Sequence, residues 1–307
     1  MKAAVIGVGH LGRHHARILA SLPGVSLAGV VDVNRDRAAQ VAGEYGTRAY
    51  GDVNEIPDKL DVVVIAVPTE SHAAIALPLI ESGVHTLVEK PVTQTVKEAD
   101  TLIAAARRAG VVLAVGHSER FNPAVAAARP HIKEPRFIEV HRLGTSPERS
   151  LDIDVVLDLM IHDLDLILSV VASDVERVEA VGVPVLTPRV DIANARVRFK
   201  NGCIANLTAS RISRESVRKI RFFQRDAYVS IDTAARDVEM WSLVPQPGAA
   251  PKIGGGKLAV NGDEPLKREL EDFIAAVRDR RPPAVPGEEG RAALALAVRI
   301  VELMAEP

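Results

Sequence analysis

The chain is poor in cysteine, in aromatic residues and in net charge. Cys203 is the single cysteine among 307 residues, which excludes an intrachain disulfide and a metal site built from paired cysteines, so we expect a reducing, cytoplasmic setting. Aromatic residues make up 3% of the chain, which argues against platforms that stack nucleobases. A formal net charge of −2 gives no electrostatic basis for binding nucleic acid or an anionic membrane.

Long apolar runs are also missing. No stretch of about 20 uninterrupted apolar residues occurs, so no membrane-spanning segment is predicted. The chain opens on the strand-like run Lys2–Ile6 rather than on the charged and apolar regions of a signal peptide. A content of 47% hydrophobic and 25% charged residues is that of an ordinary globular protein, and the length favours two domains.

The first 119 residues alternate between strand-like and helix-like segments. The apolar strand-like runs are Lys2–Ile6, Val25–Val31, Leu60–Val67, Val84–Val88 and Val111–Val115. This alternation predicts a doubly wound parallel sheet of the Rossmann type. Ligands of such sheets bind beyond the carboxyl ends of the strands, so residues that follow the runs are candidates for the site.

A dinucleotide-binding motif lies between the first run and the first helix. The segment Gly7-Val8-Gly9-His10-Leu11-Gly12 matches G-x-G-x-x-G. Gly7 permits a tight turn, Gly9 lets the backbone approach a pyrophosphate, and Gly12 allows close packing of helix on strand. The start of the helix then offers unpaired amides to the phosphates.

An acid stands where the ribose of a dinucleotide is usually bound. Asp32 follows the second strand, twenty residues after Gly12. Its carboxylate would accept ribose hydroxyls and repel a 2′-phosphate, which favours NAD; Arg35 keeps NADP open. His117 is the best placed of several ambiguous histidines to contact nicotinamide or substrate. The predicted cofactor-binding residues are Gly7, Gly9, His10, Leu11, Gly12, Asp32, Val67, Pro68, Thr69, His72, Glu89, Lys90 and His117.

The pattern changes after residue 119 to strand candidates that follow one another. They are 136–144, Val175–Val185, Ile192–Lys200, Cys203–Ile212, Arg218–Arg225 and Ala227–Asp232. Short turns between them predict a large open, mainly antiparallel sheet in an α/β domain over residues 120–307. Pro245–Glu264, rich in Gly and Pro, is predicted to be a long loop. Two amphipathic helices, Leu266–Arg280 and Glu288–Met304, end the chain, and the last can pack back on the first domain.

A long apolar helix is predicted over residues 154–171 as the cover of this sheet. Asp158, His162 and Asp165 stand at i, i+4 and i+7, which places them on one face. Burying such groups costs several kcal/mol unless each finds a partner. The stripe is either a satisfied Asp–His pair of the core or a functional face. Divalent metal is a competing idea, but no second ligand cluster is apparent, and no metal is predicted.

Two motifs together carry a family resemblance. Glu89-Lys90-Pro91 follows the fourth strand, and Asp158-Leu159-Met160-Ile161-His162-Asp163 lies on the long helix. With the glycine motif, nearly the whole chain resembles the Gfo/Idh/MocA family of nicotinamide-dependent sugar oxidoreductases. The resemblance implies a Rossmann NAD(P)-binding domain, here 1–119, and a substrate-binding and oligomerisation domain, 120–307. It also implies a homodimer or homotetramer formed through the open sheet, and a catalytic triad of Lys90, Asp158 and His162.

Within that family, Val115–Pro123 and Asp152–Leu168 resemble the UDP-N-acetylglucosamine 3-dehydrogenase branch. Members of this branch oxidise the sugar 3-hydroxyl to a ketone, which a partner aminotransferase can aminate for lipid A. Ile153-Asp154 stands where many family members have Gly-Gly, which leaves the substrate open. The predicted substrate-binding residues are Lys90, Arg120, Asn122, Arg149, Asp158 and His162.

The expected reaction moves a hydride and a proton. His162 is the proposed general base, Asp158 would orient it, and Lys90 would stabilise the alkoxide; the sequence leaves open whether Lys90 or His162 takes the proton. A free sugar or inositol dehydrogenase and a non-catalytic NAD-binding sensor are the alternatives. The basic residues between Arg211 and Arg221 suit a solvated sheet face better than a nucleotide diphosphate site.

Overall fold

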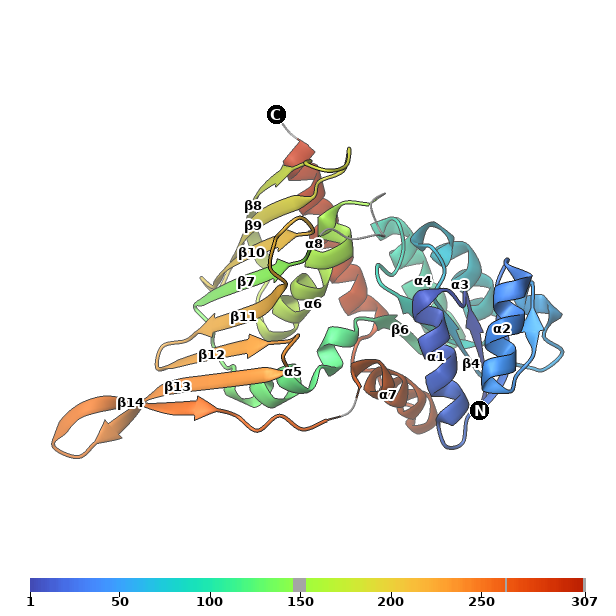
Figure 1. Cartoon of the computed structure of the whole chain (residues 1–307), viewed down its shortest axis with the longest axis horizontal. Helices are drawn as coiled ribbons and strands as arrows, with labels where there is room; N and C mark the ends of the chain where they lie inside the picture. Colours follow the sequence, from blue (N-terminus) through green and yellow to red (C-terminus); the bar gives the residue numbers. More distant parts are fainter. Residues whose placement is uncertain (146–152, 263, 306–307) are drawn as a thin grey trace. The chain divides into compact units, whose positions relative to one another are not determined.

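The chain forms two compact units in the computed structural model, which describes residues 1–145, 153–262 and 264–305. The first unit contains Met1–Ser118 and Leu266–Leu294, and the second contains Glu119–Pro265 and the residues from Ala295 on. Each unit has its own sheet (Figure 1). The functional division at residues 119 and 120 stays a prediction.

The sheet of the first unit is entirely parallel and has the strand order β3-β2-β1-β4-β5-β6. Its strands are β1 (Lys2–Ile6), β2 (Ser26–Val31), β3 (Ala49–Tyr50), β4 (Val62–Ile65), β5 (His85–Glu89) and β6 (Leu113–Gly116). This order is that of the Rossmann fold, so the predicted doubly wound sheet is confirmed. Strand β3 was not predicted, because two residues are too few to show a period.

The helices of the first unit begin and end at recognisable signals. They are α1 (His10–Ser21), α2 (Arg35–Tyr45), α3 (His72–Glu81), α4 (Val96–Ala109) and α7 (Pro265–Asp279), with 3₁₀ turns at Val53–Glu55 and Thr69–Ser71. Helix α4 starts with a capping box between Thr95 and Glu98 and ends at Gly110 in the left-handed conformation. Ser71 occupies the N-cap of α3 but makes no side-chain cap bond.

The C-terminal helix α8 (Gly287–Ala305) begins in the first unit and ends in the second. Its first turns lie against β6: a Cβ added to Gly290 would be 2.5 Å from Val115. Arg291 also pairs with Asp100 of α4 at 2.9 Å. In the described part of the chain, no helix combines the length and apolar character needed to cross a membrane.

The sheet of the second unit has the strand order β14-β13-β12-β11-β7-β10-β9-β8. Its strands are β7 (Phe137–Leu143), β8 (Val175–Val183), β9 (Ile192–Phe199), β10 (Ile204–Ser210), β11 (Val217–Phe223), β12 (Ala227–Asp232), β13 (Asp237–Gln246) and β14 (Ala249–Lys257). Only the β7–β10 pair is parallel among these described strands. The predicted large, mainly antiparallel sheet is therefore confirmed.

The predicted loop Pro245–Glu264 is wrong, because most of it belongs to the β13–β14 hairpin at one edge of this sheet (Figure 1). Gly255 pairs with Trp241, and a Cβ on Gly255 would lie 2.0 Å from the carbonyl oxygen of Met240. The glycines thus permit close backbone approach within a strand rather than marking a loop.

One face of the second sheet is buried under helices. The covering segments are α5 (Pro123–Ala128), a π turn (Val156–Met160) and α6 (Ile161–Val170), with 3₁₀ turns at Ser118–Phe121 and Arg129–His131. Alternate strand residues such as Val140, Val197 and Ile220 face this cover and are at most 1% exposed. The helix predicted over 154–171 is therefore present, but it begins with a π turn.

Candidate active site

A cavity of about 690 Å³ lies at the carboxyl ends of β1, β2 and β4 in the first unit. Five of the predicted cofactor-binding residues line it: Gly7, Gly9, Asp32, Val67 and Pro68. The cavity lies where the fold places dinucleotides. Its position and lining therefore fit an extended nucleotide cofactor.

The three motif glycines have different surroundings. Gly7 has a φ of +84°, and a Cβ on Gly12 would lie 1.8 Å from the Gly7 carbonyl oxygen. These two residues therefore let helix α1 pack directly on the first turn. Gly9 is the N-cap of α1, and a Cβ there would meet no described atom within 4 Å. Gly9 lines the cavity, so the unpaired amides at the start of α1 are open to a phosphate.

Asp32 is fixed by backbone donors at the rim of the cavity. Its carboxylate accepts hydrogen bonds from the amides of Val8 (3.0 Å) and Asn34 (2.9 Å). Arg37 approaches the same carboxylate at 3.4 Å and lines the cavity. Arg35, the predicted alternative partner for NADP, pairs with Glu55 instead. The cation beside Asp32 is therefore Arg37, which the sequence did not single out.

His72 is buried and does not line the cavity. It is 1% exposed, and its ring nitrogens face the carbonyl oxygens of Val67 and Pro91, each at 2.9 Å. Burial lowers the pKa of His72, although the two facing carbonyl oxygens oppose the shift. The ring thus lies between the turn after β4 and the segment that carries Lys90, and when neutral it donates to only one of the two oxygens. At the start of α1, His10 is exposed, as is Leu11.

Lys90 follows the last residue of β5 and is half-buried. Glu89 before it is buried and bonded to His15 of α1 at 2.6 Å. His117, one residue beyond β6, is 1% exposed. The carboxyl ends of β5 and β6 thus carry one half-buried lysine among buried polar groups, while Thr69 lies half-buried in the turn after β4.

In the second unit, Asp158 and His162 are half-buried on the segment that starts as a π turn. Asp158 lies in the π turn and His162 in the first turn of α6. Asp165, the third member of the predicted stripe, is 1% exposed and has another environment. The three residues of the predicted stripe therefore do not share one environment, because Asp165 is buried whereas Asp158 and His162 are half-buried.

Two arginines hold this segment through ion pairs with its buried acids. Arg142 of β7 donates two hydrogen bonds to Asp163, both at 2.8 Å, and a third to Glu119 at 3.2 Å. Burial by itself lowers the pKa of a guanidinium, but the facing carboxylates raise the pKa of Arg142 above its ordinary value. Arg120 makes a similar bidentate pair with Asp165, at 2.6 and 2.9 Å.

The start of the segment is anchored separately. Arg211 is 1% exposed and donates to the Ile153 carbonyl oxygen at 2.6 Å, while Asp154 accepts from the Val190 amide at 2.9 Å. Asp191 accepts three backbone amides of the β8–β9 connection, and these bonds lower its pKa to about 2 although burial opposes them. Arg211 is thus not part of a solvated face, contrary to the prediction.

Two predicted substrate-binding residues already have partners within the second unit. Arg120 is bound to Asp165, and Asn122 caps α5 through the Ala124 amide while donating to the Thr233 carbonyl oxygen. Arg149 lies outside the described residues. The predictions missed Arg142, although a charged residue at an inward position of a strand is a signal that the sequence offers.

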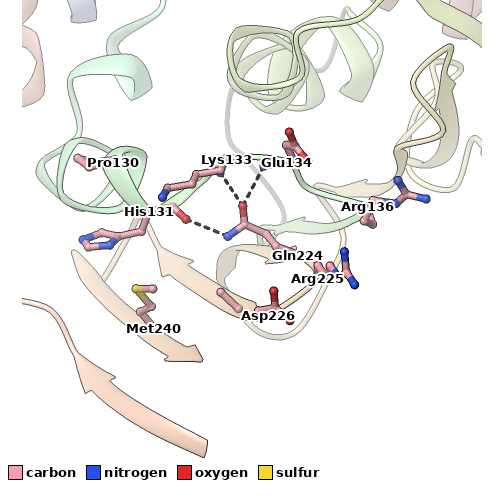
Figure 2. A pocket seen from close by; sticks show the side chains of 10 residues that line it. Pro130, His131, Lys133, Glu134, Arg136, Gln224, Arg225, Asp226 and Met240 are labelled. Atoms are coloured by element: carbon pink, nitrogen blue, oxygen red, sulfur yellow. Dashed lines mark hydrogen bonds between the residues drawn. The ribbon is translucent and has the colours of Figure 1, made fainter. Parts of the chain in front are cut away.

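A second cavity, of about 900 Å³, lies in the second unit near the turn between β11 and β12. Figure 2 shows Gln224 bonded to the backbone of His131, Lys133 and Glu134 on its wall. None of the predicted site residues lines it. Its volume exceeds that of the cavity in the first unit, but its wall is exposed and carries charges of both signs.

Comparisons with known proteins give a consistent result. Residues 1–117 match an oxidoreductase family with an NAD-binding Rossmann fold, GFO_IDH_MocA, and residues 134–228 match the GFO/IDH/MocA C-terminal domain. UDP-N-acetylglucosamine 3-dehydrogenase of Acidithiobacillus ferrooxidans is 41% identical over 98% of this chain and 96% of its own. Myo-inositol 2-dehydrogenase of Thermotoga maritima is 27% identical over 96% and 94%. A solved structure of the Acidithiobacillus enzyme superposes with a TM-score of 0.92 at 40% identity, covering 99% and 97% of the two chains.

The glycines of the motif provide a matched pair of substitutions. Gly9→Ala should leave the melting temperature nearly unchanged but raise the Kd for NADH on the order of tenfold, because its methyl group enters the space of the phosphates. Gly12→Ala should instead cost about 3 kcal/mol of folding stability through overpacking. Thermal unfolding and NADH fluorescence titration measure both. Equal loss of stability in the two variants would contradict the assignment.

Proposed function

Because the chain belongs to the Gfo/Idh/MocA family of oxidoreductases, we propose that it uses NAD to oxidise the 3-hydroxyl of UDP-N-acetylglucosamine to a ketone. The observation that carries the proposal is the 41% identity to the Acidithiobacillus 3-dehydrogenase over nearly the full length of both chains. A TM-score of 0.92 over 99% of this chain supports it. The product would then be a substrate for an aminotransferase, and a neighbouring aminotransferase gene would support that step.

Oxidation of a secondary alcohol requires removal of a proton from oxygen and of a hydride from carbon. NAD, when bound, would supply the hydride acceptor, and the residues of the chain would have to bring the carbinol carbon close to it. We assign the proton to His162, with Asp158 orienting the imidazole. Lys90 donates a hydrogen bond to the reacting oxygen and stabilises the negative charge that develops there. The assignment requires Lys90 and His162 to meet at one hydroxyl.

We propose NAD rather than NADP as the cofactor. The Asp32 carboxylate, held by two backbone amides at the rim of the cavity, would accept the ribose hydroxyls. The same negative charge would repel a 2′-phosphate. Arg37 reduces that repulsion because it is 48% exposed and can turn toward a phosphate, so the expected preference for NAD is moderate.

Purified protein with NAD should produce NADH absorbance with UDP-N-acetylglucosamine. Turnover with UDP-glucose, glucose and myo-inositol should be at least about tenfold lower in kcat/KM. All three lack the N-acetyl group, and glucose and myo-inositol also lack the diphosphate, so the groups that would bind these parts would be left unpaired. NADP in place of NAD should also lower kcat/KM. Turnover of myo-inositol alone would favour the second candidate, an inositol dehydrogenase, for which the 27% identical Thermotoga relative is the supporting observation.

The proposed triad has its own test. Lys90→Ala and His162→Ala should each lower kcat by about 100-fold or more, the usual contribution of a proton-transferring or charge-stabilising group, with the Kd for NADH changed only a few-fold. Lys97→Ala on the exposed surface of α4 serves as the control. A rate within twofold of wild type in either triad variant would refute the mechanism.

We further propose that a second copy of this chain covers the exposed face of the second sheet. That face carries a row of aromatic rings, with Phe137–Phe223 and Phe223–Tyr228 centroid distances of 5.5 and 5.1 Å. Trp241 on the next strand is 40% exposed. Such a patch flanked by charged residues suits a self-complementary two-fold interface.

The interface proposal predicts a homodimer or homotetramer in light scattering coupled to size exclusion. Phe223→Glu should shift the mass toward the monomer, because a charge would be buried against the partner's sheet. Lys97→Glu, which changes charge in the first unit, should not. A monomeric wild-type protein would contradict the proposal.

A further inference from the structure

A buried cluster outside the assigned triad includes Glu89, the residue that precedes Lys90 and accepts its backbone amide. It contains His15 of α1, Glu89 of β5 and Glu269 of α7, each at most 6% exposed. One nitrogen or oxygen atom from each of the three lies within 4.8 Å of the others. All three belong to the first unit. The cluster thus joins three elements of one compact body.

Glu89 is held through both carboxylate oxygens. Oε1 is 2.6 Å from Nε2 of His15, and Oε2 accepts the backbone amide of Lys90 at 3.2 Å. The carboxylate also lies flat against Gly116, where a Cβ would be 2.8 Å from its Cδ atom. The Glu89 side chain therefore cannot rotate without breaking these contacts. Because it accepts the Lys90 amide, it also restrains the backbone of Lys90.

A hydrogen bond explains the His15–Glu89 contact better than a metal ion. A divalent ion in such a site would lie about 2.0–2.2 Å from each ligand atom, which spreads the ligands apart. A direct separation of 2.6 Å instead suits a hydrogen bond between the two side chains. The bond also compensates for removing a carboxylate from water.

We propose that His15 and Glu89 are positioning residues for Lys90, an inference that rests on the proposed role of that lysine. Their bond joins the end of β5 to helix α1, which the glycine motif Gly7–Gly12 leads into. Displacement of that strand end by a fraction of an ångström moves the lysine away from the reacting oxygen. The His15–Glu89 pair therefore fixes the position of Lys90 relative to α1, the helix proposed to bind the cofactor phosphates.

His15→Gln and Glu89→Gln should each lower kcat by about 10- to 100-fold, the cost of a misplacement of up to 1 Å, while the Kd for NADH changes less. His85→Gln is the matched control. It replaces a histidine at the other end of β5 that accepts the Val112 amide, and should lower stability without lowering kcat. Equal losses of kcat in His85→Gln and His15→Gln would overturn the proposal.

A double-mutant cycle separates positioning from general damage. In a Lys90→Ala background, His15→Gln should add less than about a twofold loss, because residues that act through one another are not additive. A full additional loss would overturn the proposal. Stabilisation of the wild-type melting temperature by Zn²⁺, absent in His15→Gln, would also overturn it, since the cluster would then be a metal site.

A readout independent of turnover distinguishes failure of this inference from failure of the proposed function. Brief acetylation with acetic anhydride, followed by peptide mass spectrometry, measures the reactivity of Lys90 in each variant. The rate should rise at least about twofold in His15→Gln and Glu89→Gln relative to His85→Gln as the lysine loses its fixed place. An unchanged rate would refute the positioning role even in a protein that turns over no sugar.

Discussion

The bidentate pair between Arg142 and Asp163 is the constraint on which the second unit depends. Breaking a buried ion pair by removing one partner typically costs about 3–5 kcal/mol, because the remaining charge stays buried and unpaired. That energy fixes the rotation of α6 about its axis, since only one rotation presents Asp163 to β7. Once Asp163 faces the sheet, its neighbour His162 has to point elsewhere, and it remains half-buried.

The other contacts of this segment serve the same end. Arg120 holds Asp165 further along α6, and Arg211 holds the Ile153 carbonyl oxygen before the π turn. Contacts from Arg211, Arg142 and Arg120 therefore hold the segment on both sides of the residues proposed for catalysis. This arrangement explains why an apolar helix tolerates so many acids: each described buried acid on α6 is paired with an arginine from a neighbouring element.

Local patterns predicted most of the fold, because apolar runs of strand length and glycine stops are visible in short windows. The glycine motif and Asp32 were found for the same reason: their spacing is set by one strand, one turn and one helix. The β13–β14 hairpin was missed because its glycines were read as loop residues, whereas Gly255 permits a close approach to Met240 that only the partner strand reveals. Arg37 was missed because Arg35 is the basic residue that lies nearer to Asp32 in the sequence.

The supporting contacts of the candidate site could not be predicted at all, since they join distant segments. Arg142 and Asp163 are 21 residues apart, and His15 and Glu89 are 74 apart. No periodicity links such pairs. The inward strand position of Arg142 is visible in the sequence, but it does not identify the acid that pairs with it. Asn122 was predicted to bind substrate because it lies near a motif; its side-chain oxygen caps α5, and its role toward substrate stays a prediction.

The two halves of the proposed machinery share one design. Lys90 follows the buried acid Glu89, which is held by His15; His162 precedes the buried acid Asp163, which is held by Arg142. In each case the acid lies within the core and its neighbour in sequence stays accessible. A fixed backbone beside a reactive side chain limits its freedom to a few rotamers, which is the preorganisation that catalysis requires. The buried acids of both motifs are therefore best understood as anchors for the residues beside them, Lys90 and His162, which we propose to meet the substrate.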